Sequence, residues 1–95
     1  MSAWVYLLAN RPRGAIYTGV TSNLVQRVWQ HKNDVLEGFT KHYRIHDLVY
    51  LEEHTTVLLA IQREHNIKHW KRRWKVELIE GMNPKWDDLY AQITR

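Results

Sequence analysis

The chain has 95 residues, which is enough for one domain, spanning residues 1–95, with one modest hydrophobic core. Its 44% hydrophobic and 25% charged residues are typical of a folded globular protein, and the absence of cysteine excludes disulfides, thiolate zinc sites and cysteine nucleophiles. A net charge of +4 favours polyanionic partners. The N-terminal residues lack the pattern of a signal peptide and no segment approaches membrane-spanning length, so we expect a cytoplasmic protein with no membrane partner.

Strand-like and helical segments alternate along the chain. The strand-like segments are rich in apolar, β-branched and aromatic residues, whereas the helical ones repeat their apolar residues every three or four positions and follow N-cap residues such as Asn23 and Thr55 or Thr56. Gly81 is expected to end the last long helix. In chain order, we expect strands over 3–10 and 15–20, a helix over 24–35, a loop over 36–46, a strand over 47–53, helices over 56–70 and 71–80, and a short terminal helix within 86–93.

The first two strands are joined by a turn at residues 11–14. Proline at the second position and glycine at the fourth suit a type I turn. A β-hairpin closed by this turn pairs Leu8 with Tyr17 and Tyr6 with Gly19. The two tyrosines then lie on one face of the hairpin as diagonal neighbours.

The first helix has polar residues on its predicted inward face. At about 100° per residue, Leu24, Val28 and Val35 form an apolar stripe. His31 falls inside this stripe, and Arg27 lies on its edge. Both side chains are therefore expected to point toward the sheet.

The helix over 56–70 has an acidic residue in the same kind of position. Val57, Ala60, Ile61 and Ile67 form its inward stripe, and Glu64 lies near the centre, where leucine would be expected. A carboxylate is costly to desolvate, so an inward one is usually paired, bound to a metal or placed in a functional cleft.

Each of these residues alone has an ordinary structural interpretation. His31 would bond a core carbonyl, and Glu64 would form an internal salt bridge with Arg27. Together they favour a phosphodiesterase site, because they supply a fork for the phosphate, a proton-transfer group and a hard oxygen ligand for Mg²⁺.

These residues belong to an ordered set of motifs. Trp4-Val5-Tyr6 is followed by Tyr17-Thr18-Gly19, with Trp-Val and Thr at positions expected to pack within the strands. The later blocks are Thr21, Leu24, Arg27 and His31; Gly38-Phe39-Thr40-Lys41; Leu48-Val49-Tyr50; Ala60-Ile61-Gln62-Arg63-Glu64; Lys68; Trp70; and Asn83-Pro84-Lys85-Trp86. Over nearly its whole length the sequence resembles the small single-domain members of the GIY-YIG nuclease superfamily.

The resemblance implies an α/β fold of the α+β type, with a central three-stranded antiparallel sheet flanked by helices. It also implies hydrolysis of phosphodiester bonds. Glu64 would bind one Mg²⁺ or Mn²⁺ ion, which contacts the scissile phosphate and stabilises the leaving oxygen. Arg27 would neutralise charge on the phosphorus centre.

Three further residues would surround the attacking water: Tyr6, Tyr17 and His31. One of them would be the general base and another would orient the water or the phosphate. A tyrosine base would need a nearby cation, because an unperturbed phenol has a pKa of about 10. Asn83 would help to hold the geometry of the site.

Nucleic acid, with DNA favoured over RNA, is the expected partner. Residues 68–75 combine five basic residues with two tryptophans, a mixture suited to phosphate contacts and base stacking, although a solvated helix face is an equally good interpretation. No helix-turn-helix or zinc finger is apparent, so we expect little sequence specificity from the chain alone, with specificity coming either from DNA shape or from a protein partner that supplies targeting. The candidate binding residues are Gly19, Lys41, Lys68, Lys71, Arg72, Arg73 and Lys75.

Two hypotheses follow. The first is a metal-dependent endonuclease of low sequence specificity in DNA repair or recombination. The second is a non-catalytic nucleic-acid-binding or interaction module with the same fold, which would be favoured if Glu64 pointed to solvent. His65 and His69 are four residues apart but have no third ligand in a recognisable pattern, so we do not expect zinc.

Overall fold

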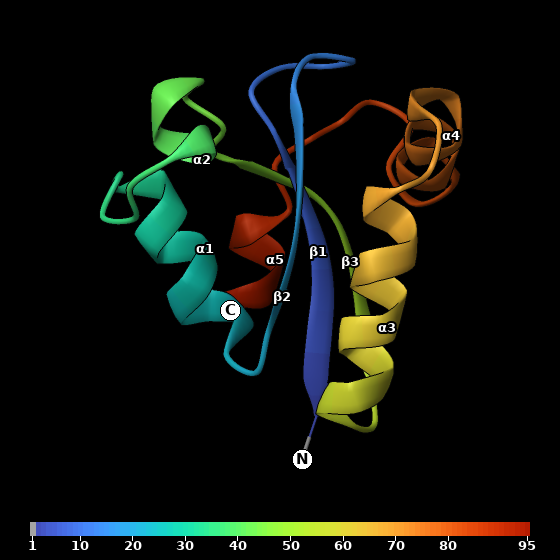
Figure 1. The fold of residues 1–95 in the computed structure, drawn as a ribbon. Helices are drawn as coiled ribbons and strands as arrows, with labels where there is room; N and C mark the ends of the chain where they lie inside the picture. Colours follow the sequence, from blue (N-terminus) through green and yellow to red (C-terminus); the bar gives the residue numbers. More distant parts are fainter. Residues whose placement is uncertain (1) are drawn as a thin grey trace.

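Helices cover both faces of a small sheet in the described part of the chain, residues 2–95 of a computed structural model (Figure 1). The three strands are antiparallel and lie in the order β2-β1-β3, so the predicted α+β fold is confirmed. In chain order, the elements are β1 (Ala3–Ala9), β2 (Ile16–Thr21), α1 (Leu24–Lys32), α2 (Phe39–His42), β3 (Asp47–His54), α3 (Val57–Lys68), α4 (Arg72–Met82) and α5 (Tyr90–Ile93). None of the described helices has the length and apolar character needed to cross a bilayer.

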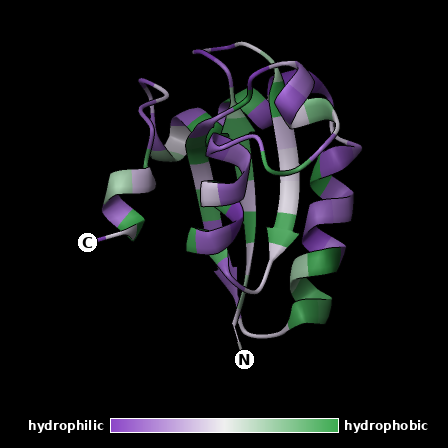
Figure 2. Cartoon of the chain, turned by 90° about the vertical axis from the view of Figure 1, so that its left-hand side faces the viewer, coloured by the Kyte–Doolittle hydropathy of each residue, from purple (hydrophilic) through white to green (hydrophobic). Residues whose placement is uncertain are grey.

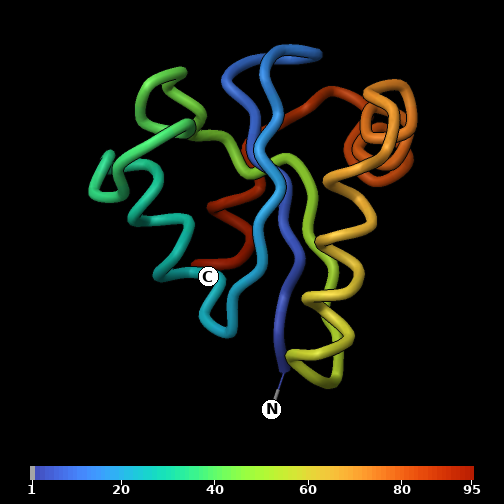
Figure 3. The backbone as a smooth tube through the Cα atoms, in the orientation of Figure 1, coloured from blue at the N-terminus to red at the C-terminus, as the bar shows by residue number. Residues whose placement is uncertain are grey.

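The central strand β1 contributes side chains to a core on each face of the sheet. Val5 and Leu7 pack in the cluster that includes residues of α3 and α4, whereas Tyr6 and Leu8 pack in the cluster that includes residues of α1. Figure 3 shows β1 between β2 and β3, with α1 and α5 on one side of the sheet and α3 on the other. This alternation follows from the two-residue period of a strand.

The hairpin has the predicted register but a different turn. Tyr6 pairs with Gly19 and Leu8 with Tyr17, as predicted. The amide of Gly14 donates to the carbonyl of Arg11 at 2.9 Å, which closes the turn. However, Arg13 has φ of 56°, which a type I turn does not allow at its third position, so the type I prediction is wrong.

Residues of α4 form hydrogen bonds with the hairpin turn. The guanidinium of Arg72 donates to the carbonyl oxygens of Arg13 and Gly14, at 2.5 and 2.6 Å. The side chain of Arg13 forms two hydrogen bonds with Glu80, at 3.0 and 2.9 Å. These contacts supply the tertiary support for a left-handed residue that the turn sequence alone does not specify.

Several helix boundaries differ from the prediction. α1 ends at Lys32, because Asp34 adopts a left-handed conformation with φ of 52°, and Val35 is exposed instead of completing the apolar stripe. Residues 36–46 were expected to form a loop but contain the short helix α2. Two successive helices, α3 and α4, are present as predicted, whereas Gly81 lies inside α4, which continues to Met82.

The predicted inward stripe of α3 is also partly wrong. Ala60 and Ile67 are fully buried, but Val57 and Ile61 are exposed. α3 meets the sheet through a narrow strip with the spacing i, i+4 and i+7, in which Glu64 is the middle position. Figure 2 colours the beginning of α3 as hydrophobic, where these apolar residues lie at the surface.

Gly19 has a steric role that its pairing with Tyr6 explains. A Cβ atom at Gly19 would lie 2.4 Å from Cζ and 2.5 Å from the hydroxyl oxygen of Tyr6, and 2.9 Å from Cε2 of Tyr17. Such approaches require the rings to move. The absence of a side chain at Gly19 therefore leaves the space in which the Tyr6 ring lies.

We predict that Gly19→Ala lowers the free energy of unfolding by about 1–3 kcal/mol, the usual cost of overpacking a core. Gly81→Ala is the matched control, because its Cβ meets no atom within 4 Å and it lies within α4. Alanine there leaves the stability unchanged or raises it by up to about 1 kcal/mol, since glycine is the poorer helix former. Equal effects of the two substitutions in chemical denaturation would contradict the steric role of Gly19.

Candidate active site

Two tyrosines and a histidine form an aromatic cluster on the α1 side of the sheet. The ring centroids lie 6.2 Å apart for Tyr6 and Tyr17, 5.8 Å for Tyr6 and His31, and 5.2 Å for Tyr17 and His31. Tyr6 and His31 are buried, whereas Tyr17, on the edge strand β2, is only partly buried. The hairpin register brings the two tyrosines together, and the inward face of α1 brings His31 to them.

His31 is held through both nitrogens of its ring. Nε2 lies 3.0 Å from the hydroxyl of Tyr6, and Nδ1 lies 3.0 Å from the hydroxyl of Thr40. Burial, followed by the positive charge of Arg27 and by His46, lowers the pKa of His31 to about 4. His31 is therefore a neutral imidazole near neutral pH, bonded to two neutral hydroxyl groups.

Charged groups act on the buried tyrosine from the neighbouring helices. Burial, followed by the adjacent Tyr17, raises the pKa of Tyr6. Arg27 lowers it and Glu64 raises it further, so both charges act on the Tyr6 hydroxyl. Residues of both α1 and α3 therefore contribute to the electrostatic environment of the aromatic cluster.

Glu64 is paired with a lysine one turn further along α3. Its carboxylate lies 2.8 Å from Nζ of Lys68, and the Glu64 side chain is only 13% exposed. The alternative in which Glu64 points to solvent is therefore not observed, and neither is the expected salt bridge with Arg27 among residues 2–95. The pKa of Lys68 is raised, first by its hydrogen bond to Glu64 and also by the charge of Tyr17.

The donor set of Glu64 fits one hard divalent cation. Groups of three His, Cys, Asp or Glu side chains that could enclose an ion do not occur among the described residues. Mg²⁺ does not need such an enclosure, because it keeps several waters and binds through one or two carboxylates and the phosphates of a substrate. Glu64 could hold such an ion if Lys68 released the carboxylate.

Comparison with known proteins identifies the family of the chain. The family model described as the GIY-YIG catalytic domain matches residues 2–77. The chain belongs to the GIY-YIG family. A UPF0213 protein of Staphylococcus epidermidis is 37% identical over 67 residues, which cover 70% of this chain and 82% of that protein. A UPF0213 protein of Staphylococcus saprophyticus is 36% identical over 66 residues, covering 70% of this chain and 80% of the relative.

A solved structure has the same fold. The solution NMR structure of a UPF0213 protein from Bacillus halodurans aligns with a TM-score of 0.58 and 25% sequence identity over 93% of both chains. GIY-YIG proteins form a family of nucleases, and nucleic acid is the substrate class that the family implies. The names of these relatives state no activity, metal or substrate.

The positions that depart from the GIY-YIG motif are packing positions, as expected. Val5 is fully buried beside the α3 core, Thr18 is buried, and Trp4 packs partly against the α1 core. None of these side chains replaces a member of the aromatic cluster. The departures therefore leave the two motif tyrosines and Gly19 in place.

The side-chain hydrogen bonds of Asn83 are to backbone groups of β3 and of the segment after α4. Its amide nitrogen donates to the carbonyls of Val49 at 3.1 Å and Asp87 at 2.8 Å, and its oxygen accepts from the amide of Asp87 at 3.1 Å. It is buried and holds the segment after α4 against β3. Its described bonds support the fold and do not reach Tyr6, Tyr17 or His31.

Most of the candidate nucleic-acid-binding residues already have intramolecular partners. Arg72 supports the hairpin turn, as described above, and Lys68 pairs with Glu64. Lys41 lies 2.8 Å from Glu37, Lys75 donates to the carbonyl of Lys68 at 3.2 Å, and Lys71 lies 5.8 Å from the centre of the Trp74 ring. Their binding role therefore stays a prediction, as does that of Arg73.

The sequence does not indicate the roles that the structure gives to two residues near the aromatic cluster, Thr40 and Lys68. Thr40 lies within the Gly38-to-Lys41 block, but nothing in its spacing indicates a bond to His31. Lys68 was assigned to nucleic acid, although its spacing of four residues from Glu64 is that of a helical ion pair. That spacing is the one signal that could have indicated its position beside the carboxylate.

We predict that His31 makes the protein less stable in acid. The unfolded histidine takes up a proton near its ordinary pKa of 6.5, whereas the folded one does so only at about 4. Its contribution is therefore complete above pH 6.5 and is lost as the pH falls toward 4, by roughly 3 kcal/mol in total.

Denaturation of the wild type and of His31→Gln across this pH range measures that contribution. The pH dependence is expected to be weaker in His31→Gln and unchanged in the control His65→Gln, whose side chain is exposed. If wild type and His31→Gln had parallel profiles, His31 would not be the neutral, buried group described above.

Proposed function

We propose that this protein is an endonuclease that hydrolyses phosphodiester bonds of DNA with one divalent metal ion and little sequence specificity, in DNA repair or recombination. The observation that carries the proposal is the partly exposed Tyr17 beside a buried Tyr6 and His31, with the charges of Arg27 and Glu64 close to them. This combination occurs within a GIY-YIG catalytic domain.

Arg27 and Glu64 have different roles toward the phosphate in this proposal. The guanidinium of Arg27 donates to the non-bridging oxygens and offsets the charge that develops on them. Glu64 is the group that would hold Mg²⁺ or Mn²⁺, and such an ion would supply positive charge to polarise the phosphate and stabilise the leaving oxygen. The positive charge of Lys68 lies beside the same carboxylate.

Among the three candidates for the general base, we assign the role to Tyr17. Tyr6 is fully buried and its pKa is raised, so it stays protonated. His31 is buried and both of its ring nitrogens are engaged. Tyr17 alone of the three has appreciable surface from which a hydroxyl could reach a water molecule.

A tyrosine base requires a nearby cation, and we assign this part to Lys68. The pKa of Lys68 is raised, first by its hydrogen bond to Glu64 and also by the charge of Tyr17, so the two side chains interact electrostatically. In the reaction, the water oxygen bonds to phosphorus, a water proton passes to the Tyr17 phenolate and the bond from phosphorus to the sugar oxygen breaks. Solvent protonates the leaving oxygen, and Tyr17 returns its proton to solvent.

One observation favours the alternative of a non-catalytic binding module. An inward carboxylate without a metal would repel phosphate, but here Lys68 neutralises Glu64. The pair could therefore lie under a bound phosphate without net repulsion. An experiment has to separate binding from cleavage.

We predict that purified protein cuts labelled single-stranded, duplex or branched DNA in Mg²⁺ or Mn²⁺ but not in EDTA. Glu64→Gln keeps the shape of the side chain but removes the charge that binds the ion. It should reduce the cleavage rate by at least about a hundredfold, because a catalytic metal contributes several kcal/mol to the transition state.

Glu53→Gln is the control, since Glu53 is an exposed acidic residue of β3. It should cleave like the wild type, and the circular dichroism of both variants should match that of the wild type. DNA binding without cleavage on any of these substrates would instead support the non-catalytic module.

A further inference from the structure

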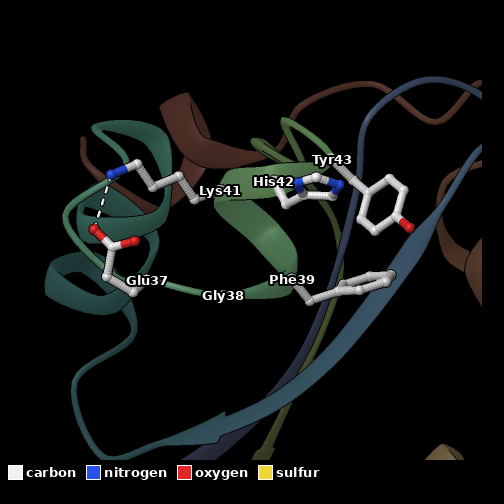
Figure 4. A pocket seen from close by; sticks show the side chains of 6 residues that line it. All are labelled: Glu37, Gly38, Phe39, Lys41, His42 and Tyr43. Carbon is white, nitrogen blue, oxygen red and sulfur yellow. Dashed lines mark hydrogen bonds and ion pairs between the residues drawn. The ribbon is translucent and has the colours of Figure 1, made fainter.

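A pocket of about 740 Å³ opens at α2 (Figure 4). It lies outside the cluster of Tyr6, Tyr17 and His31, although the same short helix contributes to both. The pocket is lined by Glu37, Gly38, Phe39, Lys41, His42 and Tyr43. Figure 4 shows Phe39 and Tyr43 on the same side of α2, with the Lys41–Glu37 ion pair on the other side.

The aromatic side chains of this pocket are not part of either core. Phe39 is 48% exposed and Tyr43 is 50% exposed. Their ring centroids lie 4.8 Å apart at 48°, and the His42 ring meets the edge of Tyr43 at the same distance. Three adjacent rings that remain open to solvent supply flat surfaces on which another ring can stack.

The side chain of Thr40, which follows Phe39 in the sequence, holds α2 against the rest of the domain. Thr40 is buried and bonds His31, so Phe39 and Lys41 are the direct neighbours of a residue that contacts the aromatic cluster. On the other flank, the amide of Asn10 donates to the carbonyl of Tyr43 at 3.4 Å. The pocket therefore lies between the candidate active site and the hairpin turn.

The charge around the pocket is suited to a polyanion. Lys41 and Arg44 are exposed basic residues of this segment, and Arg11 follows Asn10 in the hairpin turn. Lys41 is paired at 2.8 Å with Glu37, the acidic member of the lining, so these two charges offset each other and the remaining positive charge of the rim comes from Arg44 and Arg11. An apolar ring surface within a basic rim matches a nucleotide, which has a stacking base and an anionic phosphate.

We propose that the α2 pocket, defined by Phe39, His42 and Tyr43, binds one unstacked base of the nucleic-acid strand whose backbone enters the active site. The inference rests on the proposed function, because it identifies how that site selects its substrate. A base reaches such a pocket only where it is unpaired or turned out of the helix. The pocket therefore favours single-stranded or branched DNA over a continuous duplex.

The test uses oligonucleotides with 2-aminopurine at successive positions, bound in EDTA so that no cleavage occurs. Wild-type protein should quench the fluorescence at one position, because the base stacks on the rings. Phe39→Leu and Tyr43→Leu should abolish that quenching and weaken binding about tenfold, within the range known for loss of base–aromatic stacking. Phe39→Tyr and Tyr43→Phe keep a ring and should keep both signals.

Trp29→Leu is the matched control, because Trp29 is a comparably exposed aromatic residue, at 51%, on α1. It should leave quenching and affinity unchanged. Equal signals in the leucine variants, the control and the wild type would overturn the pocket assignment. The outcome is independent of catalysis. If the wild-type protein cleaved DNA but quenched no single 2-aminopurine position, only the pocket assignment would be refuted. If it quenched one position but did not cleave in Mg²⁺, only the nuclease would be refuted.

Discussion

The hydrogen-bonded chain from Thr40 through His31 to Tyr6 is the interaction on which the site depends. Its members come from α2, α1 and β1, and each is buried. A buried polar group without a partner is costly, so the two bonds at 3.0 Å select one placement of the two helices on the sheet. The same bonds position the buried rings beside which Tyr17 remains partly exposed.

The groups in this hydrogen-bonded chain are neutral, whereas the charged groups lie around it. Burial keeps His31 deprotonated and Tyr6 protonated near neutral pH, so neither places a charge in the interior. Arg27, Glu64 and Lys68 retain partial exposure on the surrounding helices. Under the proposed function, neutral buried rings with charged groups around them suit an anionic substrate, because the charged groups would act on the phosphate while the buried rings need no counter-ion of their own.

The sequence predicted those parts of the site that follow from local periodicity. The turn fixed the pairing of Tyr6 with Gly19, and helical spacing placed His31 and Glu64 inward. α2 was missed because a four-residue helix has no measurable period and depends on the tertiary contact of Thr40. The predicted inward stripe of α3 includes two residues that are exposed, Val57 and Ile61. Periodicity cannot show how much of a helix surface the sheet covers, because that depends on where the helix lies on the sheet.

The pairing of Glu64 with Lys68 changes how an inward carboxylate is interpreted. From the sequence alone, Glu64 suggests a metal because a lone buried charge would be too costly. With the ammonium at 2.8 Å, its burial is explained without an ion, so Glu64 by itself does not distinguish a nuclease from a binding module. Under the proposed function the distinguishing feature is Tyr17: it packs at the edge of the α1 core but keeps partial exposure, and a hydroxyl within reach of solvent is what proton abstraction from water requires.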